Sequence, residues 1–497
     1  MNGSCRPMFP AILLTIAAAW GVSSAEPPVS ATAGRIKAFC IDLNWSKGVF
    51  AAPGTFAHAS AEEHFRWYRD LGINTIQTFC VSCDGCAWFR GSVAPVQPGM
   101  KGDFLKELTA LGHANGMKVM GYFCVAANTH WGKTHPELSH GTPGNAPHIP
   151  LSTPYLDYLC ASINDALTCT GIDGFMIDWV WEVDPKWTDC EKTMYRELFS
   201  EAFPASGTVP ADRMAEFKRR AVDRAWGRIR ETTKAAKADA VLWLSCNNLN
   251  DLQVKGSRMF REIDWLMNEH PDFASLEAAR KAAGPHTKIV QCVCGWGAQH
   301  NTRHIIRSLD TQDVGFYGFA EPDVKTTLPP SESQNAHLGG NALNIRRMRE
   351  VFHGIRLVVR PEPDGRIVLK ARDADTHGPT PAYAGTDGND HIGWWGDPKD
   401  SVSWTFDAPH AGMYSVEVVY SCTAGAGGSA FTVSVGEQSL VGTAKETGSW
   451  KTYAPQDLGT LRLAKAGENT LVVKPNTPPT WKVIGLQSVT LKPAAGE

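Results

Sequence analysis

Between residues 36 and 323, the sequence repeats one pattern eight times: a short apolar run followed by a stretch with helical periodicity. Amphipathic stretches such as SAEEHFRWYRDLG separate the runs and often stop at a glycine, as at Gly72. Strands that alternate with helices form parallel sheets, and eight such repeats predict a (β/α)8 barrel, the TIM barrel. The predicted strands are residues 36–45, 75–81, 118–128, 174–181, 241–248, 263–270, 288–297 and 314–323.

The pattern changes after Gly354. Apolar and polar residues now alternate with a period of two, as in SVSWTFDAP and GMYSVEVVYSC, and Gly, Pro and Asn punctuate the runs. A chain of 497 residues is also too long for a single hydrophobic core. We therefore predict a barrel over residues 34–356, followed by an all-β sandwich over residues 365–495.

The first residues have the pattern of a secretory signal peptide. Arg6 supplies the positive start, residues 8–20 the apolar stretch, and Ala25 ends a small-residue cleavage site. We predict that residues 1–25 are removed and that the protein is secreted or periplasmic. No other apolar run reaches the roughly 18 residues that cross a bilayer, so no membrane span is expected.

Composition narrows the class of partner. The formal net charge is −3, so no basic excess indicates a nucleic-acid partner.

Cysteines such as Cys40 and Cys292 lie in apolar runs, which favours small core residues over a dense disulfide framework. Cys83 and Cys86 form a lone CxxC, for which a local disulfide remains an alternative and a metal site a weaker one.

Polar and aromatic residues gather where the predicted strands end. The active site of a TIM barrel lies at these ends. Carboxylates, amides and indoles dominate there, with few cations and no glycine-rich anion site, so a neutral sugar fits better than a phosphate. These residues are Asp42, Asn44, Trp45, Asn128, His130, Trp131, Asp178, Trp179, Trp181, Glu182, Asn247, Asn248, Glu269, His270, Trp296, Glu321 and Asp323.

Glycoside hydrolysis needs two carboxyl groups on either side of the scissile bond. Asp178 ends the apolar run GFMID and is our candidate nucleophile. Glu269, in WLMNEHPD on the sixth strand, is the candidate acid/base, because an apolar approach raises the pKa of a proton donor. Glu321 is the main rival partner, and Glu182 is expected beyond the strand tip.

The remaining strand-end residues are assigned to substrate binding. We expect Trp45, Trp131, Trp179 and Trp296 to shape the sugar subsite, Asn128 and Asn247 to bind sugar hydroxyls, and Asp42 and Glu321 to complete the set. His130, His135, His140 and His148 match no metal spacing and are interpreted as solvated loop histidines. No metal site and no organic cofactor are expected.

Three segments of the barrel resemble the α-L-fucosidases of glycoside hydrolase family 29. They are TFCVSCDGCAWF (78–89), GDFLKELTALGHANGMKVMGYFCVAANTHW (102–131) and GIDGFMIDWVW (171–181). The resemblance implies a retaining mechanism with Asp178 as the nucleophile, but it does not identify the acid/base. The paired histidines that bind fucose in that family are replaced here by Ser82 and Cys83, which places fucose specificity in question.

The C-terminal segment resembles the galactose-binding-like sandwich of carbohydrate-binding modules of families 6 and 35, through DHIGWWGDPKDSVSWTFDAPHAGMYSVEVVYSC, GSWKTY and LAKAGENTLVVKP. The resemblance nominates Trp450 for stacking on a sugar, with Trp394 and Trp395 as alternatives. Packing of these indoles in the sandwich core is the competing interpretation. The same resemblance allows a structural calcium ion, although no ligand set is evident.

The sequence thus predicts a secreted retaining glycoside hydrolase, similar to α-L-fucosidases, that acts on a polysaccharide or oligosaccharide. One alternative is a non-catalytic glycan-binding protein on a barrel scaffold, which the missing histidine pair motivates. Another is a metal-dependent barrel hydrolase.

Overall fold

The structure is a computed structural model. It describes residues 34–140, 148–246, 249–269, 273–295, 313–329, 342–355, 357–378, 380–384, 389–397, 399–476 and 481–494, with Thr302, Ile306 and Leu309. The predicted signal peptide, residues 1–25, lies outside the described residues.

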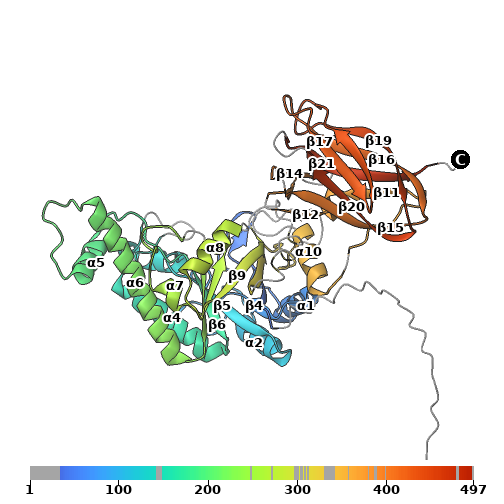
Figure 1. Ribbon diagram of the computed structural model, residues 1–497. Coiled ribbons are helices and arrows are strands. Elements are labelled where there is room, and N and C mark those ends of the chain that lie inside the picture. The colour runs from blue at the N-terminus through green and yellow to red at the C-terminus, as the bar shows by residue number, and fades with distance from the viewer. Residues whose placement is uncertain are drawn as a thin grey trace, which may run out of the picture.

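The first part of the chain is a closed barrel of parallel strands, and antiparallel sheets follow it, which confirms the predicted fold class (Figure 1). Each barrel strand pairs with the next in the chain, and β1 closes the ring by pairing with both β4 and β10. The barrel strands are β1 (Lys37–Ile41), β4 (Thr75–Gln77), β5 (Lys118–Cys124), β6 (Gly174–Asp178), β7 (Val241–Cys246), β8 (Trp265–Asn268), β9 (Lys288–Cys294) and β10 (Gly315–Ala320).

Helices cover the outside of the barrel (Figure 1). Local signals set their ends: Ser60 caps α1 by accepting from the backbone N–H of Glu63, and Gly72 ends it with φ of 85°. The helices are α1 (Ala61–Leu71), α2 (Phe104–Ala114), α3 (Thr129–Thr134), η1 (Pro136–Leu138), α4 (Thr153–Thr170), α5 (Asp189–Phe199), α6 (Ala211–Ala236), α7 (Met259–Glu262), α8 (Phe273–Ala282) and α10 (Ala342–Phe352). None in the described part of the chain is both long and apolar enough to cross a bilayer.

A short hairpin follows β1 and consists of β2 (Trp45–Ser46) and β3 (Val49–Phe50). Barrel strands such as β9 are buried almost continuously, as expected for a parallel sheet covered on both faces. The barrel strands are parallel, so their carboxyl ends all lie at the same end of the barrel.

The C-terminal part is a sandwich of two antiparallel sheets packed over one apolar core. Burial along β16 alternates residue by residue, as the period-two sequence pattern predicts. One sheet contains β11 (Ile367–Lys370), β13 (Ala382–Ala384), β14 (His391–Gly393), β16 (Gly412–Ser421), β19 (Tyr453–Leu463) and β21 (Gly485–Pro493). The other contains β12 (Asp375–His377), β15 (Ser401–Ala408), β17 (Ala430–Val435), β18 (Gln438–Thr443) and β20 (Gly467–Pro475), and the 3-10 turn η2 (Ala371–Asp373) precedes β12.

Gly174 allows β6 and β7 to approach each other at the start of the strand that carries Asp178. A Cβ atom at this position would lie 2.0 Å from the backbone oxygen of Val241, and φ is 154°. The atoms nearest to such a Cβ belong to the backbone of Val241 and cannot move aside as the end of a flexible side chain could. No side chain therefore fits at position 174. The spacing of these two strands therefore depends on glycine.

We predict that Gly174→Ala lowers the free energy of unfolding by about 2–3 kcal/mol or prevents folding, because the added methyl group forces β6 away from β7. Gly171→Ala is the matched control: its φ is 76° and no atom lies within 4 Å of an added Cβ, so only about 1 kcal/mol is expected. Urea denaturation followed by circular dichroism measures both. Equal losses would show that the close approach does not matter.

Candidate functional site

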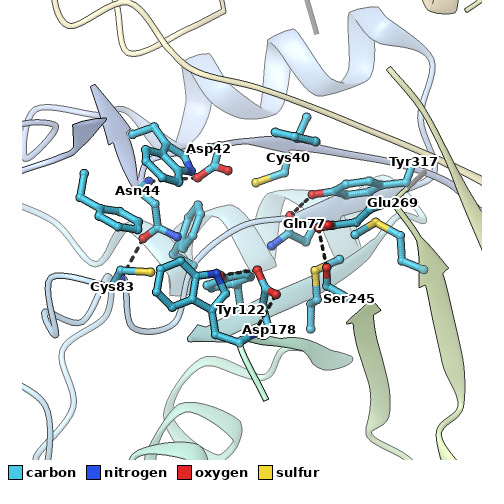
Figure 2. A pocket seen from close by; sticks show the side chains of 17 residues that line it. Cys40, Asp42, Asn44, Gln77, Cys83, Tyr122, Asp178, Ser245, Glu269 and Tyr317 are labelled. Carbon is cyan, nitrogen blue, oxygen red and sulfur yellow. Dashed lines mark hydrogen bonds between the residues drawn. The ribbon is translucent and has the colours of Figure 1, made fainter. Parts of the chain in front are cut away.

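A small cavity of about 60 Å³ lies at the carboxyl ends of the barrel strands (Figure 2). Side chains from β1, β4, β5, β6, β7, β8 and β10, or from the residues just after them, line it, so strands far apart in the sequence contribute to one site. The lining residues are Cys40, Asp42, Asn44, Trp45, Phe50, Gln77, Phe79, Cys83, Tyr122, Met176, Asp178, Trp179, Ser245, Met267, Glu269, Tyr317 and Phe319.

Asp178 occupies the last position of β6, where its carboxylate is held by two donors. Tyr122 donates its hydroxyl hydrogen bond to Oδ2 at 2.9 Å, and the backbone N–H of Trp179 donates to Oδ1 at 2.8 Å. Burial raises the pKa of Asp178 to about 7, the charge of Glu269 adds to the rise, and the two hydrogen bonds oppose it. The side chain is therefore oriented and near the midpoint of its ionisation at neutral pH.

Trp179 has a left-handed backbone, with φ of 56°. Its N–H donates to the carboxylate of Asp178, and the left-handed φ turns the chain sharply directly after that bond. Few residues with a large side chain adopt such a conformation, and in known proteins it is concentrated at functional sites.

Glu269 follows directly after β8 and faces the same cavity (Figure 2). Ser245 on β7 donates a hydrogen bond of 2.7 Å to its Oε1. The negative charge of Glu269 raises the pKa of both Asp178 and Asp42. These carboxyl groups therefore interact electrostatically within one cavity.

Asp42 brings a third carboxyl group into the cavity from the end of β1. The backbone N–H of Asn44 donates to its Oδ1 at 3.1 Å. Burial raises its pKa to about 7, the hydrogen bond from Asn44 opposes this, and the charges of Glu321 and Glu269 add to it. Like charges that are kept from water cannot all ionise easily, so protons are retained near neutral pH.

Two of the predicted tryptophans form an aromatic wall. Trp45 stacks on Phe50, with ring centroids 4.1 Å apart and planes inclined by 19°. Phe50 in turn meets Trp179 edge to face at 5.5 Å. The β2–β3 hairpin thus brings an indole next to the loop that follows Asp178.

The sequence analysis missed four polar side chains that line the cavity. Tyr122 and Ser245 hold the carboxylates, and Tyr317 donates a hydrogen bond of 2.9 Å to Oε1 of Gln77. The Nε2 atom of Gln77 is buried and has no hydrogen-bond partner in the described residues. All four lie within strands rather than after them, and only the alternation of inward-facing positions would have indicated them.

Other predicted residues lie elsewhere. Asn128 caps α3 by accepting from the backbone N–H of Trp131 at 2.8 Å, and Trp131 stacks on His135 at 3.8 Å. Glu321 is buried and accepts from the backbone N–H of Gly48 at 3.3 Å. None of the three lines the cavity, and their role in binding substrate stays a prediction. Asn247 and Trp296 lie outside the described residues.

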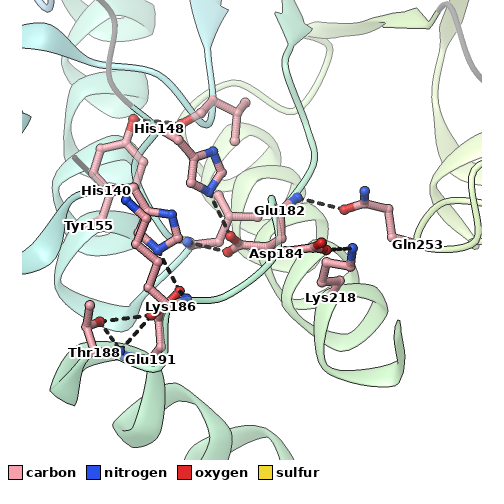
Figure 3. A network of polar contacts seen from close by, with 12 residues as sticks. His140, His148, Tyr155, Glu182, Asp184, Lys186, Thr188, Glu191, Lys218 and Gln253 are labelled. Atoms are coloured by element: carbon pink, nitrogen blue, oxygen red, sulfur yellow. Dashed lines mark hydrogen bonds and ion pairs between the residues drawn. The ribbon is translucent and has the colours of Figure 1, made fainter. Parts of the chain in front are cut away.

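Glu182 belongs to a buried network beside the site (Figure 3). Its Oε2 lies 2.9 Å from Nε2 of His148, and its Oε1 accepts from the backbone N–H of Leu151 at 2.6 Å. His140 pairs similarly with Glu191, at 2.6 Å. The interpretation of His140 and His148 as solvated is wrong: both rings are largely buried, because they anchor loops through carboxylates.

The cysteines whose side chains the structure describes are unpaired, Cys83 and Cys86 included, so the CxxC forms no disulfide. Cys83 lines the cavity, and its backbone N–H donates to Oδ1 of Asn44 at 2.9 Å. Within the described ranges, no three His, Cys, Asp or Glu side chains are grouped so that they could hold a metal ion.

On the sandwich, Trp394 and Trp450 are large exposed aromatic residues, at 52% and 45% of their full accessibility. Trp394 stacks near His391, and His391 contacts the hydroxyl of Tyr453 at 2.9 Å. The backbone of Trp394 is left-handed, with φ of 59°. Trp395 is fully buried and packs against Trp481 in the core. The core interpretation therefore applies to Trp395, and two of the three nominated indoles face solvent.

Comparison with known proteins gives one family match. The model of a family described as "Hypothetical glycosyl hydrolase 6" matches residues 60–179, which run from the cap of α1 to the residue after Asp178. This match supports a glycoside hydrolase. No curated protein sequence matches the chain.

Several solved structures are similar to this one at low identity. An α-L-fucosidase isoenzyme 2 from Paenibacillus thiaminolyticus is 12% identical over 89% of this chain and all of that one, with a TM-score of 0.37. A cycloisomaltooligosaccharide glucanotransferase from Paenibacillus sp. is 13% identical over 93% of this chain, which spans 58% of that enzyme, with a TM-score of 0.34. A family 35 carbohydrate-binding module from Clostridium thermocellum is 18% identical over 25% of this chain and 97% of that one, with a TM-score of 0.23.

The raised pKa values predict how stability depends on pH. A carboxyl group with a folded-state pKa of about 7 and an ordinary pKa of 3.8 stabilises the fold fully below about pH 4, and this contribution is lost as the pH rises through 7. The variant Asp178→Asn has no ionisable carboxyl group at this position. We compare the melting temperature of Asp178→Asn with that of the wild type at each pH. The difference, variant minus wild type, is predicted to be about 2–5 °C larger at pH 8 than at pH 5.

Differential scanning calorimetry at both pH values tests this, with the exposed Asp239→Asn as the control. The control is expected to shift the melting temperature equally at the two pH values. A pH-independent shift for Asp178→Asn would show that its carboxylate ionises normally in the folded protein.

Proposed function

We propose that the protein is a secreted retaining glycoside hydrolase, similar to α-L-fucosidases, that cleaves a terminal sugar from extracellular glycans. The observation that carries the proposal is a pair of carboxyl groups, Asp178 and Glu269, on different strand ends of one small cavity. The family match across Asp178 agrees with this chemistry. The export signal predicted for residues 1–25 fits a glycan outside the cell.

In the proposed first step, an oxygen of Asp178 attacks the anomeric carbon while Glu269 gives its proton to the leaving oxygen, and the glycosidic bond breaks. Tyr122 and the N–H of Trp179 hold the attacking carboxylate in place. In the second step, Glu269 removes a proton from water, and the water oxygen displaces Asp178 from the sugar. Asp178 and Glu269 thereby return to their starting protonation states.

The walls of the cavity suit a neutral sugar. The buried Nε2 of Gln77 has no partner in the described residues, so a sugar hydroxyl would satisfy a donor that otherwise costs stability. Trp45 and Trp179 offer flat apolar faces. The hydroxyl oxygen of Ser82 accepts a hydrogen bond of 2.6 Å from Nε1 of Trp88. Ser82 therefore does not take the place of the sugar-binding histidine of family 29, and the sugar contacts differ.

The sandwich is proposed to bind glycan through Trp394 and Trp450. Both indoles are exposed: Trp394 stacks near His391, which contacts the hydroxyl of Tyr453, and Trp450 lies three residues before Tyr453 in the chain. Exposed, oriented aromatic faces are the usual means of stacking on sugar rings.

The catalytic proposal is tested with a panel of nitrophenyl glycosides, α-L-fucoside included. We expect turnover by the wild type, a loss of about 10³-fold or more in kcat for Asp178→Asn, and no change for Asp239→Asn. Glu269→Gln is expected to lose far less with a dinitrophenyl leaving group, which departs without a proton, than with a poor one.

Other outcomes point to the alternatives. Sugar affinity that survives Asp178→Asn, with no turnover by any form, would support a glycan-binding protein. Activity that a chelator abolishes and zinc restores would support a metal-dependent hydrolase.

We further predict that the acidic limb of the kcat/KM profile has its midpoint near pH 7, because Asp178 must lose its proton to act as nucleophile. Asp42→Asn removes a charge that raises this pKa, so the midpoint should move to lower pH. Tyr122→Phe removes a stabilising hydrogen bond, so it should move to higher pH. Shifts in the same direction for both variants would contradict the assignment of Asp178 to this limb.

A further inference from the structure

A second cavity, of about 340 Å³, opens beside the first, and the two share Asp178 and Ser245 as walls. It lies between the chain that follows β6, the end of β7, and α7. We name it the side pocket. Its volume falls in the range of small-ligand sites, whereas the first cavity is too small for a whole glycoside.

The side pocket has mostly apolar walls. They come from Val180 and Trp181 after β6, Leu244 on β7, Val254, and Met259 and Phe260 on α7. Trp181 is partly exposed and its ring lies 5.2 Å from that of Trp179, inclined by 30°. The aromatic surface of the first cavity thus continues into the side pocket.

Two polar residues complete the walls, Asp251 and Gln253. Gln253 is buried, and its Oε1 accepts from the backbone N–H of Glu182 at 2.6 Å. The Oδ1 of Asp251 accepts from the backbone N–H of Gln253 at 3.0 Å, which holds the turn in shape. The side pocket is therefore built by hydrogen bonds already made within the protein.

We propose that the side pocket binds the leaving group of the substrate, and that this group is neutral, about one ring in size, and has an apolar face. The inference rests on the proposed function. Ser245 provides the link, because it donates to Glu269, the acid that protonates the leaving oxygen, and also forms the wall common to both cavities. Glu269 itself does not line the side pocket, so a group attached to that oxygen would enter the side pocket past Ser245.

Charge specifies the chemistry further. Among the described residues, the lining contains the carboxyl groups of Asp178 and Asp251 and no lysine or arginine. An anionic leaving group, such as a uronic acid or a phosphate ester, would meet like charge without a cation to pair with. An aromatic ring, or a neutral sugar with its apolar face on Trp181, fits these walls.

The test uses the sugar that the nitrophenyl panel identifies, presented as its 4-nitrophenyl glycoside and as its glycosyl fluoride. Fluoride is a leaving group that fills no pocket, so only the nitrophenyl substrate depends on this site. Val254→Trp fills the side pocket. It is expected to lower kcat/KM for the nitrophenyl glycoside at least tenfold more than for the fluoride.

Trp181→Ala removes the stacking surface without filling the space and is expected to lower the same ratio by about threefold to tenfold. Leu252→Trp is the matched control, because Leu252 is 72% exposed and does not line the side pocket. It should leave the ratio unchanged. For the wild type, a 4-carboxyphenyl glycoside should react at least tenfold less efficiently than the phenyl glycoside.

The outcomes separate this inference from the proposed function. Hydrolysis of neither substrate by the wild type would overturn the proposed function, and the inference with it. Hydrolysis of both by the wild type, with equal losses in Val254→Trp and Trp181→Ala, would retain the hydrolase and overturn the leaving-group site. Equal reaction of the charged and neutral aryl glycosides would overturn the requirement for a neutral group.

Discussion

The closure of eight parallel strands brings carboxyl groups from β1, β6 and β8 into one cavity shielded from bulk water. Asp42, Asp178 and Glu269 repel one another there, and desolvation disfavours the charge of Asp42 and of Asp178. Such an arrangement opposes folding, so the rest of the barrel must offset it. Strands buried on nearly every residue supply the apolar area that does so.

Local hydrogen bonds keep the charged groups in usable positions. Asp178 has the hydroxyl of Tyr122 and a backbone N–H, Asp42 has a backbone N–H, and Glu269 has the hydroxyl of Ser245. Each donor stabilises the ionised form and fixes the direction of a carboxylate. Desolvation, with a smaller contribution from like-charge repulsion, outweighs these donors and sets the pKa values of Asp42 and Asp178 near 7 instead of near 4.

The sequence predicted the barrel and the carboxyl groups for a simple reason. An apolar run that ends in a carboxylate marks a strand tip, and the tips of a closed parallel barrel converge. Tyr122, Gln77 and Tyr317 escaped notice because they lie within the runs, where only the pairing register shows which residues face inward. Gln77, for example, lies opposite Cys40 on β1 and Met120 on β5.

The contacts of loop residues were harder to predict, because sequence periodicity does not show where a loop packs against the rest of the protein. Asn128 caps a six-residue helix, a role that Asn before a helical turn does suggest. His140 and His148 looked solvated, yet they pair with Glu191 and Glu182 from a distant part of the chain. Nothing in the spacing of these histidines indicates carboxylate partners more than thirty residues away.

The left-handed backbone at Trp179 and Trp394 has a consequence for how such a protein evolves. Glycine or asparagine would adopt either conformation at less cost, and a non-glycine residue held there costs on the order of 1–3 kcal/mol. Random substitution at these two positions therefore tends to yield a more stable chain that has lost an indole. Selection for stability alone would not favour tryptophan at either position.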